Sequence, residues 1–217
     1  MTRSSPATLG GLDPFYPILP DLDWMARLVP LGLKVVQLRL KDAPAAEVER
    51  QIAGSLAICR AHDCRLIVND YWRQALALGA EYIHLGQEDL AAADVAAIKR
   101  AGVRLGVSTH SLDELAIAMA AKPDYIALGP VYQTRLKAMK WGPQGLDKVA
   151  DWKRRIGALP LVAIGGITPE RAPGVMTAGA DSVAVITDFM THTDPAQRIR
   201  TWLDWSAAQQ IAATARP

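Results

Sequence analysis

Eight short apolar segments, each followed by a stretch with helical residue spacing, constrain the fold of this chain more than any other feature. Residues 161–164, Leu-Val-Ala-Ile, are typical, because they form the unbroken apolar run that a parallel strand buried on both faces needs. Strands that alternate with helices predict a parallel sheet. The expected strands are 15–19, 34–39, 65–68, 82–85, 103–107, 125–128, 161–164 and 182–185. The expected helices are 22–31, 48–59, 72–78, 94–101, 112–121, 146–156, 169–178 and a last one that carries Ile199, Trp202 and Leu203.

Three of these units repeat one pattern, in which a turn is followed by an acidic residue (Glu81, Asp124 or Asp181) and then by a buried strand. Eight units in 217 residues fit a single (β/α)8 TIM barrel of the α/β class, near the lower size limit of that fold. The alternative is an open doubly wound sheet, but no Gly-x-Gly-x-x-Gly follows an early strand. We expect a flexible N-terminal arm at 1–11, the barrel domain at 12–206 and a C-terminal tail at 207–217.

The composition limits the classes of partner. Lys and Arg number 24 against 22 Asp and Glu, so the net charge of +2 favours neither nucleic acid nor a membrane surface. The sequence contains no run of 18 or more apolar residues, so no transmembrane helix is expected. The first eleven residues lack the apolar core of a signal peptide. Cys59 and Cys64 are expected to be free, buried thiols, which favours the cytoplasm. The expected partners are small molecules, and a homo-oligomer is compatible with these features.

Polar residues follow most of the expected strands. In a barrel the carboxyl ends of the strands share one rim, and active sites of barrels lie on that rim. The residues placed there are Gln37, Arg39, Lys41, Asn69, Asp70, Asp89, Ser108, Thr109, His110, Thr134, Arg135, Lys137, Thr187 and Asp188.

Asp70 and Asp89 follow neighbouring strands, so their carboxylates are expected to meet. Mg²⁺ prefers oxygen ligands and is usually held by one or two carboxylates together with phosphate. Each aspartate alone could instead cap the helix that follows it. The pair on adjacent strands favours a magnesium site.

Arg39 and Lys41 lie on the same side of an extended chain beside that pair. A guanidinium and an ammonium next to Mg²⁺ suit a diphosphate, although both residues could also form a solvated rim paired with the acids. Lys137 is predicted to contact phosphate. His110 could act as an acid or base, but a hydrogen-bonded structural role is the simpler expectation, and His84 is expected in the core.

The pair Gly165-Gly166 ends the seventh strand abruptly. Thr168 suits the N-cap position and Pro169 the first position of a helix, so we expect a helix to start there. Free N–H groups at that point would form an anion site, and the alternative is a tight turn with nothing bound. The residues alone thus predict a barrel with a phosphate cup and a Mg²⁺–diphosphate corner on one rim, as a transferase with a diphosphate leaving group requires.

The chain resembles the thiamine-phosphate synthase family from about the first strand to the eighth. The segments that carry the resemblance are Gln37-Leu38-Arg39-Leu40-Lys41, Asn69-Asp70, His84-Leu85-Gly86-Gln87-Glu88-Asp89, Gly106-Val107-Ser108, Gly129-Pro130-Val131 and Ala163-Ile164-Gly165-Gly166-Ile167. The resemblance implies a (β/α)8 barrel that joins hydroxymethylpyrimidine diphosphate to thiazole phosphate and releases diphosphate with the help of Mg²⁺.

The resemblance also implies roles for individual residues. Asp70 and Asp89 would bind Mg²⁺. The catalytic residues would be Arg39, Lys41, Ser108 and Lys137. The residues that contact substrate would be Gln37, Leu38, Arg39, Leu40, Lys41, Asn69, Ser108, Thr134, Arg135, Leu136, Lys137, Gly166, Ile186 and Thr187. The implied mechanism is dissociative: the positive charges stabilise the departing diphosphate, and the thiazole nitrogen attacks the pyrimidine carbocation.

The sequence departs from the family pattern at two positions. The family has Thr-x-Thr-Lys after the sixth strand, whereas Leu136 here lacks the second hydroxyl, and Asp188 adds a carboxylate beside the phosphate cup. Two alternatives stay open, and only the second of them rests on these two departures. One is a tautomerase-like barrel that isomerises thiazole phosphate through a residue such as His110, and the other is a non-catalytic ligand sensor.

Overall fold

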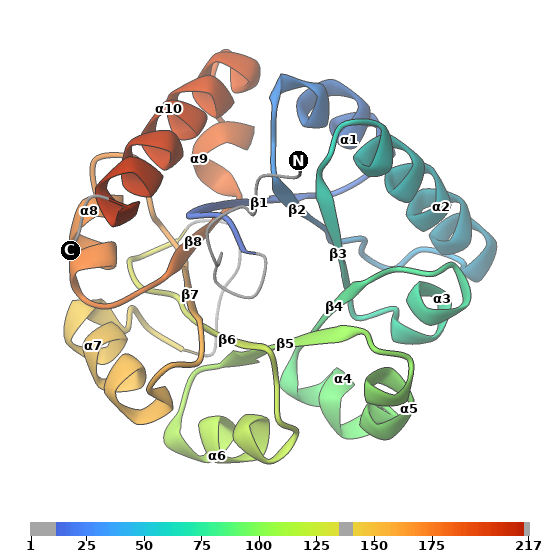
Figure 1. Cartoon of the computed structure of the whole chain (residues 1–217), viewed down its shortest axis with the longest axis horizontal. Helices are drawn as coiled ribbons and strands as arrows, with labels where there is room; N and C mark the ends of the chain where they lie inside the picture. Colours follow the sequence, from blue (N-terminus) through green and yellow to red (C-terminus); the bar gives the residue numbers. More distant parts are fainter. Residues whose placement is uncertain (1–11, 135–140, 215–217) are drawn as a thin grey trace.

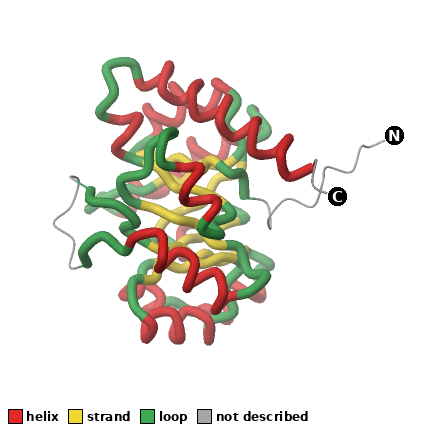
Figure 2. Tube along the Cα trace, turned by 90° about the vertical axis from the view of Figure 1, so that its left-hand side faces the viewer, coloured by secondary structure: helices red, strands yellow, loops and turns green. Residues whose placement is uncertain are grey.

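The computed structural model describes residues 12–134 and 141–214, and all structural statements below concern these two ranges. Within them, eight parallel strands close into a barrel in sequential order from β1 to β8. Figure 1 looks into this ring of strands and shows the helices arranged around its outside. Figure 2, turned by 90°, shows the strands in the middle with helices covering them. The predicted (β/α)8 barrel is confirmed.

The strands are β1 (Phe15–Leu19), β2 (Val35–Leu38), β3 (Arg65–Asn69), β4 (Tyr82–Leu85), β5 (Arg104–Thr109), β6 (Tyr125–Leu128), β7 (Leu161–Ile164) and β8 (Ser182–Val185). The helices are α1 (Leu22–Leu28), the 3₁₀ turn η2 (Val29–Leu31), α2 (Ala45–Ala61), α3 (Trp72–Ala77), α4 (Gln87–Ala92), α5 (Val95–Arg100), α6 (Leu112–Ala120), α7 (Gly145–Ile156), α8 (Ala172–Thr177), α9 (Thr187–Met190) and α10 (Pro195–Thr214).

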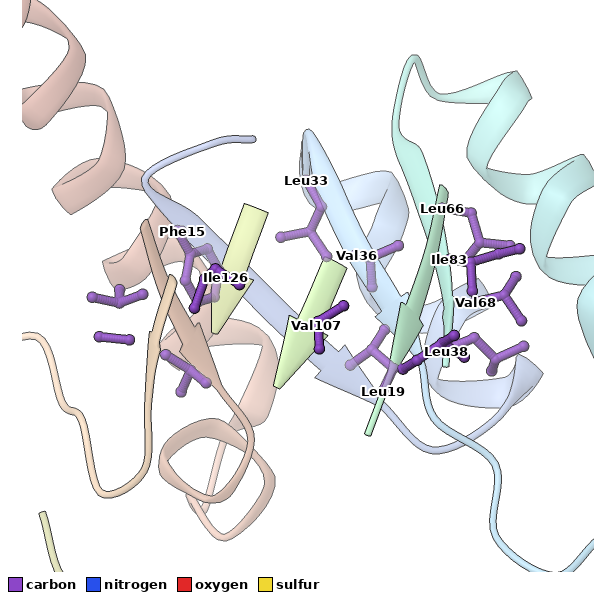
Figure 3. Close-up of a cluster of buried hydrophobic side chains, with 14 of the residues drawn as sticks. Phe15, Leu19, Leu33, Val36, Leu38, Leu66, Val68, Ile83, Val107 and Ile126 are labelled. Atoms are coloured by element: carbon purple, nitrogen blue, oxygen red, sulfur yellow. The ribbon is translucent and has the colours of Figure 1, made fainter. Parts of the chain in front are cut away.

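Alternation along each strand separates two apolar clusters. Outward-facing residues such as Phe15, Val36 and Val68 pack under the helices in the larger cluster, part of which is shown in Figure 3. Inward-facing residues such as Tyr16 and Tyr125 fill the barrel itself. The period of two along a strand produces this division. It also decides which side chains can reach a ligand in the barrel mouth.

Two of the three repeated acidic residues have a structural role at the amino ends of the strands. Asp181 accepts hydrogen bonds from the backbone of Leu161 (2.8 Å) and from Lys153 Nζ (2.7 Å). Asp124 makes the same pair of contacts with the backbone of Leu105 and with Lys99, both at 2.7 Å. Each carboxylate thus ties the next strand to its neighbour and to a preceding helix.

The boundaries of α8 and α10 differ from expectation. α8 begins at Ala172, not at Pro169, because Thr168 to Arg171 form only a turn in which the N–H groups of Arg171 and Ala172 both donate to Thr168 O. α10 continues past Ser206 to Thr214, and Gln210 in this extension donates to Asp13 Oδ2 at 2.7 Å. The Ala-rich segment is therefore helical as far as the structure describes it, and the expected arm at 1–11 lies outside the described residues.

Cys59 and Cys64 are both free and buried, as expected. Within the described part of the chain, no helix is long and apolar enough to cross a membrane.

Candidate active site

A cavity of about 90 Å³ opens at the carboxyl ends of the strands, and residues on or just after all eight strands line it. Its two walls differ in character. Tyr16, Gln37, Arg39, Asn69, His84 and Ser108, from β1 to β5, form a mainly polar wall. Ala127, Val162, Ile164, Ala184 and Ile186, from β6 to β8, form an apolar wall that Ile18 completes. One face for hydrogen bonds and one for packing suit a flat heterocyclic ring.

Hydrogen bonds connect the polar wall to the barrel interior. Gln37 Nε2 donates to Tyr16 Oη, and the hydroxyls of Tyr16 and Tyr125 lie 3.1 Å apart. His84 joins the set through both ring nitrogens: Nδ1 lies 2.8 Å from Tyr125 Oη, and Nε2 lies 2.8 Å from Ser108 Oγ. The five side chains form one continuous chain of hydrogen bonds between β2 and β5.

Burial keeps the side chains of this hydrogen-bond chain electrically neutral. It lowers the pKa of His84 to about 4, with a further contribution from the nearby charge of Arg39. It also raises the pKa of both tyrosines well above the ordinary value. The imidazole is therefore uncharged at physiological pH, and both phenols keep their protons.

The expected carboxylate pair is present. The side chains of Asp70 and Asp89 are in hydrogen-bonding contact, and Asp70 also accepts from the backbone N–H of Gly86 and from Asn69 Nδ2. Burial and the neighbouring Asp89 raise the pKa of Asp70 to about 6. Two carboxylates held together at an energetic cost are a donor set that fits a hard divalent cation.

The simpler helix-capping explanation does not account for this pair. The N-cap of α3 is Tyr71, not Asp70, and Asp89 lies inside the first turn of α4, whose N-cap is Gly86. Asp70 has φ = 67°, a left-handed conformation that Asp and Asn tolerate better than most residues. Within the described residues no group of three or more His, Cys, Asp or Glu side chains could hold a metal, so a cation here would need substrate oxygens or water as well.

One of the two expected basic side chains is shown to act on the pair. Arg39 lines the cavity, and its positive charge acts on the Asp70 carboxyl. Lys41 is exposed just beyond β2. Leu38 and Leu40 have side chains in the outer core, so any contact that they make with a substrate would be through the main chain.

The residues expected to form the phosphate cup lie on the other side of the rim. Gly166 follows β7, whereas Ile186 and Thr187 follow β8, its hydrogen-bonded neighbour. Gly166 has φ = 63°, and a Cβ there would lie 2.6 Å from Gln133 O, so glycine lets this turn pack against the loop after β6. Since α8 starts only at Ala172 and has six residues, the expected helix N-terminus is not part of the cup. Thr134 is half-buried, whereas Arg135, Leu136 and Lys137 lie outside the described residues.

Asp188 does not present a free carboxylate to the cup. Arg198 binds it through two nitrogens, Nε at 2.7 Å and Nη2 at 2.8 Å, and Trp202 Nε1 donates to it at 2.8 Å. Arg198 also lies 3.5 Å from Glu170. The departure at Asp188 thus belongs to an ion pair that ties α9 to α10.

His110 has a structural role, as expected. Its Nδ1 lies 2.8 Å from Glu114 Oε2, its backbone N–H donates to the same oxygen at 2.7 Å, and its ring stacks on Trp141. It does not line the cavity. This geometry removes the main support for an isomerase that uses His110.

Sequence reasoning missed part of the cavity. It assigned His84 to the core, and it gave no role to Tyr16 and Tyr125. His84 is buried as expected, but it also lines the cavity. The alternation within Tyr82-Ile83-His84-Leu85 was the available signal, because it faces His84 inward like Tyr82.

The fold and the rim define a (β/α)8-barrel enzyme whose site suits a heterocycle that carries phosphate groups. Comparison with known proteins identifies the family. The family model "Thiamine monophosphate synthase" matches residues 17–189, and the chain belongs to that family. The resemblance noted in the sequence is confirmed.

Individual relatives agree. The chain is 59% identical over 192 residues to a thiamine-phosphate synthase of Rhizobium etli, covering 88% of this chain and 94% of that protein. It is 49% identical over 179 residues to the Cronobacter sakazakii thiamine-phosphate synthase, covering 82% and 85% of the two chains. Among solved structures, a thiamine phosphate pyrophosphorylase of Pyrococcus furiosus matches with a TM-score of 0.80 at 26% identity, over 93% of this chain and 98% of that one.

Proposed function

We propose that this protein joins hydroxymethylpyrimidine diphosphate to thiazole phosphate, giving thiamine phosphate and diphosphate. The observation that carries the proposal is the family membership over most of the chain, together with a relative at 59% identity. The two-walled cavity and the charged corner beside it support the same reaction.

In this proposal the polar wall holds the pyrimidine, and Arg39, Lys41 and Lys137 hold its diphosphate. Asp70 and Asp89 are the protein ligands for Mg²⁺. When bound, the cation neutralises charge on the diphosphate oxygens. Gly166, Ile186, Thr187 and Thr134 surround the phosphate of the thiazole.

The bond changes need little from the protein beyond positioning and charge. The C–O bond between the pyrimidine methylene and the diphosphate breaks, and its electron pair leaves with the diphosphate. The thiazole nitrogen then donates its lone pair to the methylene carbon and becomes a cation, so no proton has to be removed. Basic side chains fixed around the leaving group favour the charge that develops there.

The proposed location is the cytoplasm, in keeping with two thiols that stay free. The proposed partners are the two small-molecule substrates.

The test is release of diphosphate when both substrates are mixed, with and without Mg²⁺. We expect release only with both substrates and Mg²⁺, and strong loss in Asp89→Asn. Glu88→Gln is the matched control, since this exposed neighbour in the same turn of α4 undergoes the same change of charge. A folded wild-type protein that binds neither substrate and releases no diphosphate would overturn the proposal, and substrate binding with no turnover would favour a ligand sensor.

A further inference from the structure

The hydrogen-bond chain inside the barrel has more members than substrate binding alone requires. Its two ends, Gln37 and Ser108, line the cavity from β2 and β5. Its inner members Tyr16, Tyr125 and His84 connect them through four consecutive hydrogen bonds. Two fully buried phenol groups in a barrel interior are costly unless each hydroxyl finds partners.

A glycine on β5 makes room for the contact between Tyr125 and His84. Tyr125 is on β6 and His84 is on β4, so the phenol has to cross β5 to reach the imidazole. It does so at Gly106, where a Cβ would lie 2.0 Å from Tyr125 Cζ and 2.4 Å from its hydroxyl. The two rings then lie nearly parallel, with centroids 5.5 Å apart. The absence of a side chain at Gly106 thus allows the hydrogen-bond chain to continue from Tyr125 to His84.

Proton counting requires all four hydrogen bonds to run in the same direction along the hydrogen-bond chain. Tyr16, Tyr125 and the imidazole of His84, which is buried between two neutral hydroxyls, each carry one exchangeable proton and have two partners, so each satisfies both only by donating once and accepting once. When Gln37 donates to Tyr16, as the structure shows, every bond runs the same way and His84 donates to Ser108. The Ser108 hydroxyl proton is then available to the cavity, and the Gln37 side-chain oxygen is available as an acceptor.

The reverse direction exchanges these roles. If Ser108 donated to His84, each inner member would turn, and Tyr16 would donate to the Gln37 oxygen. Ser108 would then offer the cavity only an acceptor, and Gln37 would offer a donor. A mixed arrangement would leave a buried hydroxyl unsatisfied, which costs about 1–3 kcal/mol.

We propose that Tyr125, the one member that does not line the cavity, is a positioning residue that acts through its neighbours Tyr16 and His84. It couples the hydrogen-bonding state of Gln37 to that of Ser108, and so fixes which way round an aminopyrimidine ring binds. Such a ring carries an amino donor and ring-nitrogen acceptors, and a Gln37 acceptor with a Ser108 donor offers one partner of each kind. This inference rests on the proposed function, because it takes the pyrimidine diphosphate as the ligand.

The test compares Tyr125→Phe with Thr109→Val. Tyr125→Phe removes the middle hydroxyl and keeps the ring. Thr109 is adjacent to Ser108 on β5, but its hydroxyl donates to Ala127 O and accepts from Trp152 Nε1, both at 2.9 Å. Thr109→Val therefore removes a buried hydroxyl with two partners and leaves the chain intact.

Titration calorimetry would use three ligands in the presence of Mg²⁺: hydroxymethylpyrimidine diphosphate, its analogue without the amino group, and thiazole phosphate. We expect Tyr125→Phe to weaken binding of the first about tenfold and to reduce its preference over the analogue to about twofold or less, with thiazole phosphate unaffected. Thr109→Val is expected to lower the melting temperature and to keep the preference. If Tyr125→Phe does not fold, Tyr16→Phe removes the neighbouring hydroxyl with its bonds to Gln37 and Tyr125, and the preference for the amino group should fall in the same way.

The outcomes separate the two proposals. A wild type that binds the pyrimidine diphosphate while Tyr125→Phe keeps the full preference for the amino group would overturn the coupling and leave the proposed function standing. An equal loss of preference in Thr109→Val would also overturn it. A wild type that does not bind the pyrimidine diphosphate would overturn both.

Discussion

Asp70 and Asp181 are the same residue type at opposite ends of one barrel, and their surroundings are opposite in kind. Asp181, at the amino end of β8, meets an ammonium and a backbone N–H. Asp70, at the carboxyl end of β3, meets a second carboxylate, and its pKa is raised to about 6 by burial and by Asp89. Asp181 is thus paired with a cation, whereas Asp70 lies against a second carboxylate, and its hydrogen bonds from Asn69 and Gly86 and the charge of Arg39 leave its pKa raised, as in a site that awaits a cation.

The largest effect is expected for Asp70→Asn. Turnover should fall by at least about 100-fold, because one of the two proposed Mg²⁺ ligands is lost. Asn is preferable to Ala here, since φ = 67° strains an Ala side chain and would confuse loss of function with loss of stability. Diphosphate release measured at saturating Mg²⁺ is the readout, and turnover at the wild-type level would remove Asp70 from the metal site.

The same variant should be more stable than the wild type without metal. A raised folded-state pKa means that Asp70 costs stability once it ionises; the cost is absent below its ordinary pKa of 3.8 and complete above about 6. Asp70→Asn should therefore unfold like the wild type near pH 4 and gain roughly 1 kcal/mol at pH 7, allowing for partial solvent screening. Urea melts at the two pH values check the sign, and a loss of stability at pH 7 would contradict it.

Arg198→Met tests whether Asp188, next to the proposed site for the thiazole phosphate, depends on a cationic partner as Asp181 does at the amino end. The substitution leaves Asp188, with a side chain only 10% exposed, without its cation. Breaking one partner of a buried pair costs about 3 kcal/mol, so the melting temperature should drop clearly. Arg198→Lys, which keeps the charge and loses the two-nitrogen contact, should lie between. A stability equal to wild type in Arg198→Met would show that the pair contributes nothing.

Asp181→Asn should reduce stability and leave the chemistry alone. It removes the charge that pairs with Lys153 but keeps an oxygen for the N–H of Leu161, so about 1–2 kcal/mol of stability is expected to be lost. Turnover per folded molecule should match the wild type. Asp124→Asn is the internal repeat of this experiment, because Asp124 has the same two kinds of partner. A fall in turnover without a fall in stability in either variant would contradict a purely structural role for the acids at the amino end of the barrel.

The smallest effect is expected for His110→Gln. His110 is engaged by Glu114 and lies outside the cavity lining, so turnover should stay within about twofold of wild type. An isomerase that used this histidine would lose its activity in the same variant. Assaying both reactions on one preparation distinguishes the two.

The barrel was predictable because strand and helix periodicity are local properties of the chain. Eight apolar segments, each long enough for one strand and separated by helical spacing, leave few closed parallel arrangements. The boundaries were less predictable: the Thr168-Pro169 signal predicted a helix that begins only at Ala172, because the two glycines before it lead into a turn.

The rim residues were partly predictable for the same local reason. Gln37, Asn69 and Ser108 lie at the carboxyl ends of buried strands, so a rim position could be inferred from order alone, and the cavity lining includes all three. The binding and catalytic roles proposed for them remain predictions. Asp188 shows the limit of local reasoning, because its partner Arg198 lies ten positions away on another helix.

By itself, the sequence determined the strand order, the end of the barrel that carries polar side chains, and the family, since each depends on residues that are neighbours along the chain. Only the tertiary structure decided which buried polar groups touch. His84, Tyr125 and Tyr16 come from three different strands, and only closure of the barrel with a glycine at 106 brings them into contact. Contacts between residues distant in sequence follow from packing geometry, and no local pattern encodes them.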